Sequence, residues 1–144
     1  MNQLKPEFFV SALLAGDFED DRLLIHEAFR TMGWRLYEAG GRKQAIQCLR
    51  RRPVQVVVAK TDIPDWSWKR VLHDLRELPE PPQLVVVSRL ADDSLWSEAL
   101  NWGAFDVLAE PFQRDEIIRV VASARRHFEP MRRVAGAVRV AAAS

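Results

Sequence analysis

Three short apolar stretches of this 144-residue chain each run into one polar residue, and these residues are Lys60, Ser88 and Glu110. The stretches are separated by segments of helical period, a pattern typical of buried parallel strands. The C-terminal ends of such strands meet at one edge of an open α/β sheet, where these folds place their chemistry. We therefore expect an amine, a hydroxyl and a carboxylate to share one crevice.

The elements that would position these residues alternate five times along the chain. Val54 to Ala59 is the most apolar strand, which predicts a central place in the sheet. Right-handed β-α-β crossovers then predict a doubly wound parallel sheet with strand order 2-1-3-4-5. The predicted strands are residues 8–15, 34–39, 54–60, 84–88 and 105–110, and the helices with clear bounds are 19–32, 42–51 and 114–128. A third helix around Val71 and a fourth around Ala99 complete the alternation.

The composition limits the function classes. The chain is 48% hydrophobic with a net charge of +1, which suits a single soluble domain and does not predict a nucleic-acid partner. Its one cysteine, Cys48, excludes an internal disulfide, and no apolar run approaches the roughly 20 residues that span a bilayer. We expect a cytoplasmic protein without a membrane association. No glycine-rich dinucleotide loop or nucleophile elbow is present, so we expect no enzyme of those classes.

Three segments resemble the receiver domains of bacterial response regulators. Residues 103–112 (GAFDVLAEPF) resemble the family's G-A-x-D-Y-L-x-K-P-F segment. Residues 56–64 resemble its third strand and the following D-x-x-x-P loop, and residues 14–24 resemble its opening acidic motif. The resemblance covers residues 8–128 and implies the flavodoxin-like (βα)5 fold, with a receiver-like domain over residues 1–128.

The resemblance also implies where the family's phosphorylation chemistry would lie. Ala15 and Gly16 stand at the positions of the acid pair that holds Mg²⁺, and Lys60 stands at the phosphoacceptor aspartate. Ser88 matches the family's Ser/Thr position, whereas Glu110 stands at its lysine. Phosphoryl transfer needs an oxygen nucleophile, and Mg²⁺ needs oxygen ligands. We therefore predict a pseudo-receiver that keeps the fold, binds no Mg²⁺ or other cofactor, and is not phosphorylated at the usual site.

The charges at two of these positions are exchanged relative to the family, and this suggests that they act together. We predict an ion pair between Lys60 and Glu110, with two independent surface charges as the alternative. A phosphorylatable receiver that uses Asp62 or Asp17 also stays open, although Asp17 could simply cap the following helix. A small-ligand-binding flavodoxin-like domain that uses the vacated crevice is a further alternative.

The resemblance implies an output through protein contacts. Val107 stands where the family carries its aromatic switch residue, so that switch is expected to be missing. Trp96 and Trp102 could anchor a partner, or a second copy of the chain, on the face formed by the fourth helix, fifth strand and fifth helix, with ordinary core packing as the alternative. The bond before Pro111 is predicted to be cis, like the family's Lys-Pro bond.

The C-terminal segment, residues 129–144, is a basic extension. Its arginines and alanines predict a partly helical or disordered end. A docking or dimerising segment, or a weak nucleic-acid contact, is the alternative interpretation.

Overall fold

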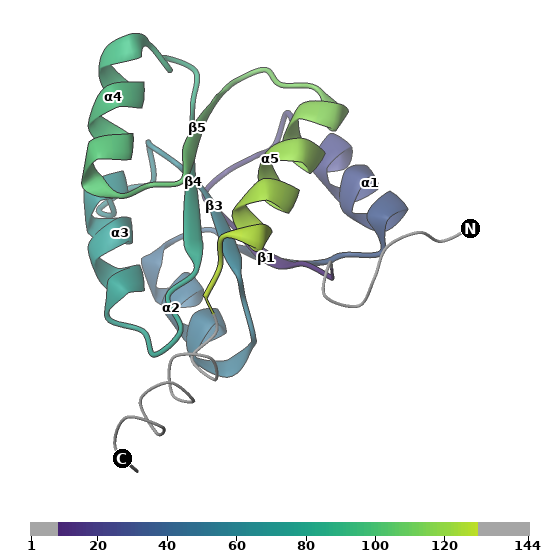
Figure 1. Ribbon diagram of the computed structural model, residues 1–144, viewed down its shortest axis with the longest axis horizontal. Helices are drawn as coiled ribbons and strands as arrows, with labels where there is room; N and C mark the ends of the chain where they lie inside the picture. The colour runs from purple at the N-terminus through teal and green to yellow at the C-terminus, as the bar shows by residue number, and fades with distance from the viewer. Residues whose placement is uncertain (1–8, 130–144) are drawn as a thin grey trace, which may run out of the picture.

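The computed structural model describes residues 9–129, in which five strands alternate with five helices (Figure 1). The strands are β1 (Ser11–Ala15), β2 (Arg35–Ala39), β3 (Val56–Lys60), β4 (Gln83–Ser88) and β5 (Asp106–Ala109). The helices are α1 (Arg22–Met32), α2 (Arg42–Arg51), α3 (Trp68–Arg76), α4 (Asp93–Trp102) and α5 (Arg114–Arg126). No helix in this range is long and apolar enough to cross a membrane.

The five strands form one parallel sheet in the order β2-β1-β3-β4-β5, which confirms the predicted topology. Helices α1 and α5 cover one face of this sheet, and α2, α3 and α4 cover the other (Figure 1). The central strand β3 is buried along its whole length, because both of its faces are covered by helices.

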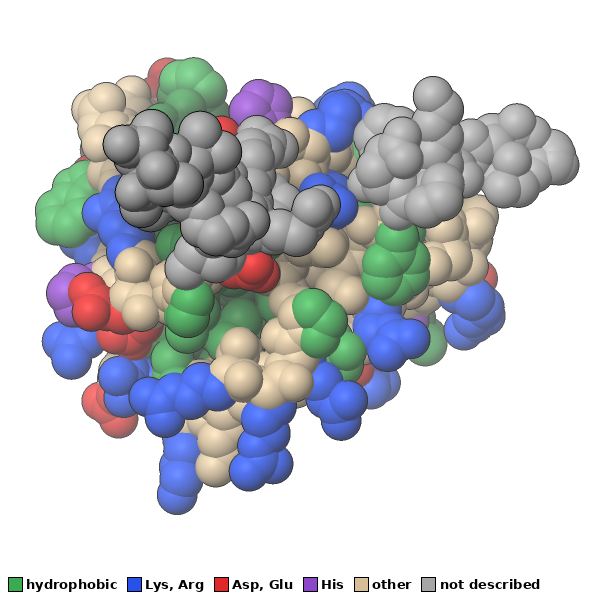
Figure 2. All heavy atoms as spheres, turned by 60° about the horizontal axis from the view of Figure 1, so that its bottom comes forward, with side chains coloured by type: hydrophobic (Ala, Val, Ile, Leu, Met, Phe, Trp, Pro, Cys, Tyr) green, Lys and Arg blue, Asp and Glu red, His purple; other side chains and the backbone are tan. Residues whose placement is uncertain are grey.

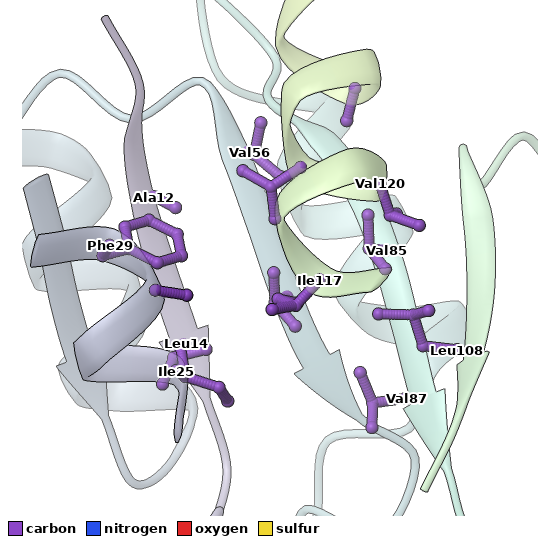
Figure 3. Close-up of a cluster of buried hydrophobic side chains, with 14 of the residues drawn as sticks. Ala12, Leu14, Ile25, Phe29, Val56, Val85, Val87, Leu108, Ile117 and Val120 are labelled. Carbon is purple, nitrogen blue, oxygen red and sulfur yellow. The ribbon is translucent and has the colours of Figure 1, made fainter. Parts of the chain in front are cut away.

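The core is divided by the sheet into two apolar clusters. Figure 3 shows the cluster beneath α1 and α5, where Ile25 and Phe29 of α1 and Ile117 of α5 pack on branched side chains of the central strands. The second cluster contains the fully buried Trp66 together with the inward faces of α3 and α4. Two packed layers therefore hold the carboxyl ends of the strands in place.

The sequence-based bounds are wrong at several ends. Helix α1 begins at Arg22 rather than at residue 19, because the preceding residues form a turn in which the Asp17 carboxylate accepts a 3.0 Å hydrogen bond from the Glu19 N–H. The acidic run therefore lies before the helix, and Asp17 does not cap it. The described part of the first strand begins at Ser11, the fifth strand ends at Ala109, and the fifth helix ends at Arg126. Apart from Glu129, the basic extension lies outside the described residues.

Candidate functional site

The three residues singled out by the sequence do lie at the same edge of the sheet. Lys60 is the last residue of β3, Ser88 is the last residue of β4, and Glu110 directly follows β5. The Glu110 N–H donates to the Ser88 carbonyl at 3.0 Å, which continues the ladder between the two strands. The Ser88 hydroxyl accepts a 3.0 Å hydrogen bond from the Leu90 N–H, so it is engaged in its own turn.

Lys60 and Glu110 form a buried ion pair. The Lys60 Nζ lies 2.8 Å from the Glu110 Oε1, and the two side chains are only 9% and 6% exposed. The predicted ion pair is thus confirmed, and the alternative of two independent surface charges is wrong. A salt bridge at this depth is insulated from water, so it ties the end of β3 to the loop after β5 more firmly than a surface pair would.

The aliphatic part of Lys60 packs into a space that the local backbone leaves open. Gly16 directly follows β1 with a φ of +112°, in the region that favours glycine. A Cβ placed on Gly16 would lie 2.9 Å from the Lys60 Cγ and 3.1 Å from Ile63. The Lys60 ammonium also lies 5.5 Å from the centre of the buried Phe18 ring. The lysine stem therefore occupies the room that a side chain at residue 16 would need.

A third charged group belongs to this site and was not singled out from the sequence. Asp21, the residue before α1, is buried at 9% exposure, and its carboxyl hydrogen-bonds to Glu110. Burial, the hydrogen bond to Glu110 and repulsion from the Glu110 charge together raise the pKa of Asp21 to about 6. Asp21 lies four residues before the buried Ile25, a helical spacing that could have marked it as inward-facing.

Glu110 is the acceptor at the centre of this cluster. Burial alone would raise its pKa, but the hydrogen bonds from Lys60 and Asp21 hold the pKa of Glu110 below its ordinary value. The pKa values of the two carboxyls are thus shifted in opposite directions, so that below about pH 6 a protonated Asp21 donates a hydrogen bond to an ionised Glu110. In this state the cluster consists of an ammonium and a carboxylic acid that both donate hydrogen bonds to one carboxylate.

The rim of the site is exposed and carries both signs of charge. The Arg89 guanidinium lies 2.9 Å from an Asp20 oxygen and 4.0 Å from the Glu110 Oε1. Together with Lys60 and Glu110 they border a hollow of about 280 Å³ whose other lining residues are Asp17, Glu19 and Asp62. Asp17 and Asp62 are thus brought to this edge of the sheet, as expected, but as exposed side chains on loops.

Three further positions lie close to the site: Trp66, Val107 and the Glu110–Pro111 bond. Trp66, in the loop after β3, is buried, and its indole N–H donates to the Asp74 carboxylate of α3 at 2.8 Å. Trp66 therefore ties the loop after β3 to helix α3. Val107, at the expected switch position, is half-buried against the α3–α4 cluster, and the Glu110–Pro111 bond is cis, as predicted.

The two tryptophans of α4 have different surroundings. Trp96 and Trp102 are 49% and 46% exposed. Trp102 packs edge-on against Trp68 and lies 4.9 Å from the Lys69 ammonium, so it faces α3. Trp96 instead borders a shallow hollow of about 440 Å³ that it shares with Val107 of β5 and Glu116 of α5. Only Trp96 therefore belongs to the surface between α4, β5 and α5.

Comparison with known proteins agrees with this fold. The family model described as "Response regulator receiver domain" matches residues 12–122, so the chain belongs to this family of two-component signalling. It is 35% identical over 106 residues to the probable transcriptional regulatory protein TcrX of Mycobacterium tuberculosis, covering 72% of this chain and 44% of that protein. The chain therefore spans less than half the length of this relative.

Solved structures of receiver domains have the same fold. The receiver domain of the Francisella response regulator 1452 superimposes with a TM-score of 0.72 at 24% identity, over 82% of this chain and 98% of that one. The receiver domain of Ssk1 from Saccharomyces cerevisiae, crystallised with the histidine phosphotransfer signalling protein Ypd1, gives 0.69 at 13% identity, over 78% and 86%. These similarities establish the architecture.

The buried ion pair predicts a strong energetic coupling. We expect Lys60→Met to lower the free energy of unfolding by about 3 kcal/mol, because it leaves Glu110 buried without its main partner. Glu110→Gln should also destabilise the fold, and the double variant should lose clearly less than the two single losses added together. Urea unfolding of all four proteins gives the coupling energy.

A surface pair in the same chain serves as the control for this cycle. Lys69 and Glu98 are 2.7 Å apart but 42% and 47% exposed. Their coupling, measured with Lys69→Met and Glu98→Gln, should be at most about 1 kcal/mol. Equal coupling energies for the two pairs would contradict the insulated environment assigned to Lys60 and Glu110.

The proton on Asp21 predicts a distinctive dependence of stability on pH. Its pKa is about 6 in the folded protein against an ordinary value of 3.8, so the folded state binds more protons between these values. Stability contributed by Asp21 is therefore present at low pH and lost as the pH rises through 6. Glu110, whose folded pKa is lowered, acts in the opposite direction only near and below its ordinary value of 4.5.

The test compares the wild type with Asp21→Asn, which keeps a neutral donor at every pH. Between about pH 5 and 7 the wild type should lose about 1 kcal/mol of stability relative to this variant, measured by urea unfolding at each pH. Asp20→Asn, at an exposed neighbouring carboxylate, should follow the wild-type curve. Parallel curves for the wild type and Asp21→Asn would show that Asp21 is ionised throughout.

Proposed function

We propose that this chain is a pseudo-receiver: a receiver domain that takes part in two-component signalling through protein contacts, without phosphorylation at the usual site. The observation that carries the proposal is the buried Lys60–Glu110 pair at the ends of β3 and β5. An ammonium cannot form an acyl phosphate, and this one is already bound to a carboxylate. The pair would hold the loops at the sheet edge in one arrangement without a phosphoryl group.

The surroundings of Lys60 support the same proposal. Gly16 and Ala15 provide no carboxylate after β1, and the Lys60 stem packs where a side chain at residue 16 would lie. Mg²⁺ prefers several oxygen ligands, so loss of the acid pair removes the family's means of holding it. Asp21 is a further buried carboxyl at this edge of the sheet, but it is hydrogen-bonded to Glu110 and has little charge to offer a cation at low pH.

The partner surface that we infer is the face formed by α4, β5 and α5. Trp96 is half-exposed there, beside Val107 and Glu116, and tryptophan is a frequent anchor of protein interfaces. Receiver domains work by contacts with partner proteins, and the yeast structure contains a receiver bound to a phosphotransfer protein. We infer that the partner here is a signalling protein or a second copy of the chain.

Intact-mass measurement tests the lack of phosphorylation. The full chain is incubated with acetyl phosphate and Mg²⁺, beside a typical receiver domain as the positive control. We expect no phosphoryl adduct on this chain while the control is modified. A stoichiometric adduct would overturn the proposal. Its loss in Asp62→Asn or in Asp17→Asn would then identify the phosphoacceptor, because these are the exposed carboxylates at the hollow.

The homodimer is tested by sedimentation velocity over a range of concentrations. We expect a concentration-dependent dimer that Trp96→Ala weakens by about tenfold or more, since a buried tryptophan anchor contributes well over 1 kcal/mol. Trp102→Ala is the matched control and should leave the dimer intact, because that ring faces Trp68 and Lys69. A chain that stays monomeric at every concentration would exclude a second copy as the partner on this face.

A further inference from the structure

A groove lies at the opposite end of the sheet from Lys60. It has a volume of about 360 Å³ and runs between the C-terminal end of α2 and the connection from α3 to β4. Its apolar surface comes from Leu49, Pro53, Val54, Leu78, Pro79 and Pro82, and its charged rim from Arg50, Arg52 and Glu80. None of these residues takes part in the site at the strand ends.

The helix beside the groove carries an unusual charge pattern. Five of the eleven residues from 42 to 52 are basic and none is acidic. Cations near the end of a helix favour its dipole, but Arg42 and Lys43 lie in the first turn, where cations oppose it. Helix stability therefore does not account for the whole pattern.

Most of these cations form no ion pair within the part of the chain that the structure describes. Arg42 pairs with Asp74 at 2.8 Å, and Arg52 lies 5.9 Å from the centre of the Tyr37 ring. Lys43, Arg50 and Arg51 are exposed and form no ion pair with another residue between 9 and 129. The lower end of the molecule in Figure 1 comes forward in Figure 2, where Lys and Arg side chains gather beside apolar ones.

The walls of the groove are stiff. Pro53 directly precedes Val54, and Pro79 and Pro82 lie on the opposite connection. Proline fixes its own φ and restricts the residue before it, so this surface has little freedom to lose when a ligand binds. A preformed apolar floor with a cationic rim selects a ligand that carries both apolar and acidic groups.

From these observations we propose that the groove binds an acidic peptide segment of a partner protein, with apolar side chains on Leu49 and Leu78 and carboxylates on Arg50 and Arg52. Arginine suits this role because its guanidinium pairs with a carboxylate through two parallel hydrogen bonds. A nucleic acid fits less well, because phosphate contacts make no use of an apolar floor and Glu80 would repel the backbone. The basic C-terminal extension of this chain has the wrong sign of charge to fill the groove.

Fluorescence anisotropy with the full chain tests this proposal. The probe is a short labelled peptide of Glu, Leu and Phe, compared with the same peptide carrying Gln for Glu, with one carrying Ser for Leu and Phe, and with a labelled DNA duplex. We expect the acidic apolar peptide to bind most tightly. Both altered peptides should bind about tenfold or more weakly, since each removes one of the two interactions.

Charge variants locate the binding. The double variant Arg50→Glu with Arg52→Glu should bind the acidic apolar peptide about tenfold or more weakly than the wild type. The milder Arg50→Gln with Arg52→Gln should lose less affinity. Arg30→Glu with Arg119→Glu makes the same change of net charge on the exposed surfaces of α1 and α5 and should leave the affinity within about twofold. Circular dichroism checks that every variant is folded.

Three results would overturn the proposal. The first is no measurable binding of the acidic apolar peptide to the wild type. The second is an equal loss in the two Glu double variants, which would mean a general charge effect. The third is tighter binding of the DNA duplex, lost with Arg50→Glu and Arg52→Glu, which would assign the surface to nucleic acid. Because phosphorylation and the Trp96 face are not involved, these results are independent of the proposed function.

Discussion

The contact between the Lys60 ammonium and the Glu110 carboxylate determines how the functional edge of this fold is built. Two charges at 9% and 6% exposure are costly unless each finds its partner, so the end of β3 and the loop after β5 must stay in register. Asp21 completes the arrangement through its hydrogen bond to Glu110. The edge of the sheet thereby brings an ammonium and two carboxyl groups together away from water, each with a partner inside the protein.

The two ends of the sheet have different character. At the carboxyl end, Lys60 and Glu110 are buried and compensate each other beneath an exposed rim that includes Asp17, Asp62 and the Arg89–Asp20 pair. At the amino end, the cations of α2 are exposed beside a proline-walled groove, and few of them form ion pairs within residues 9–129. Charges that are already paired inside the protein offer little to a ligand, whereas exposed cations without a partner can form ion pairs with one. Both surfaces that we proposed for partner binding, the groove and the face around Trp96, lie outside the crevice of the fold.

Much of this could be predicted from the sequence, and the exceptions have physical causes. Apolar runs and helical spacing are local signals, so they located every strand and helix, and the exchanged charges at Lys60 and Glu110 predicted their pairing. Asp21 was missed because its burial depends on where α1 begins, and that is decided by a turn stabilised by Asp17. Its hydrogen-bond partner, Glu110, directly follows the last strand, far along the chain from Asp21. Contacts of this kind arise only when elements distant in sequence are assembled.

The packing of the Lys60 stem over Gly16 also has a consequence for how such a protein can change over generations. A side chain at residue 16 would meet Lys60 at 2.9 Å on a backbone that already favours glycine. An acidic side chain at residue 16 would clash with Lys60. Replacing Lys60 alone would leave Glu110 buried without its partner. Either substitution is therefore unfavourable while the other two residues are unchanged. Gly16, Lys60 and Glu110 therefore constrain one another, and a carboxylate at residue 16 would require several of them to change together.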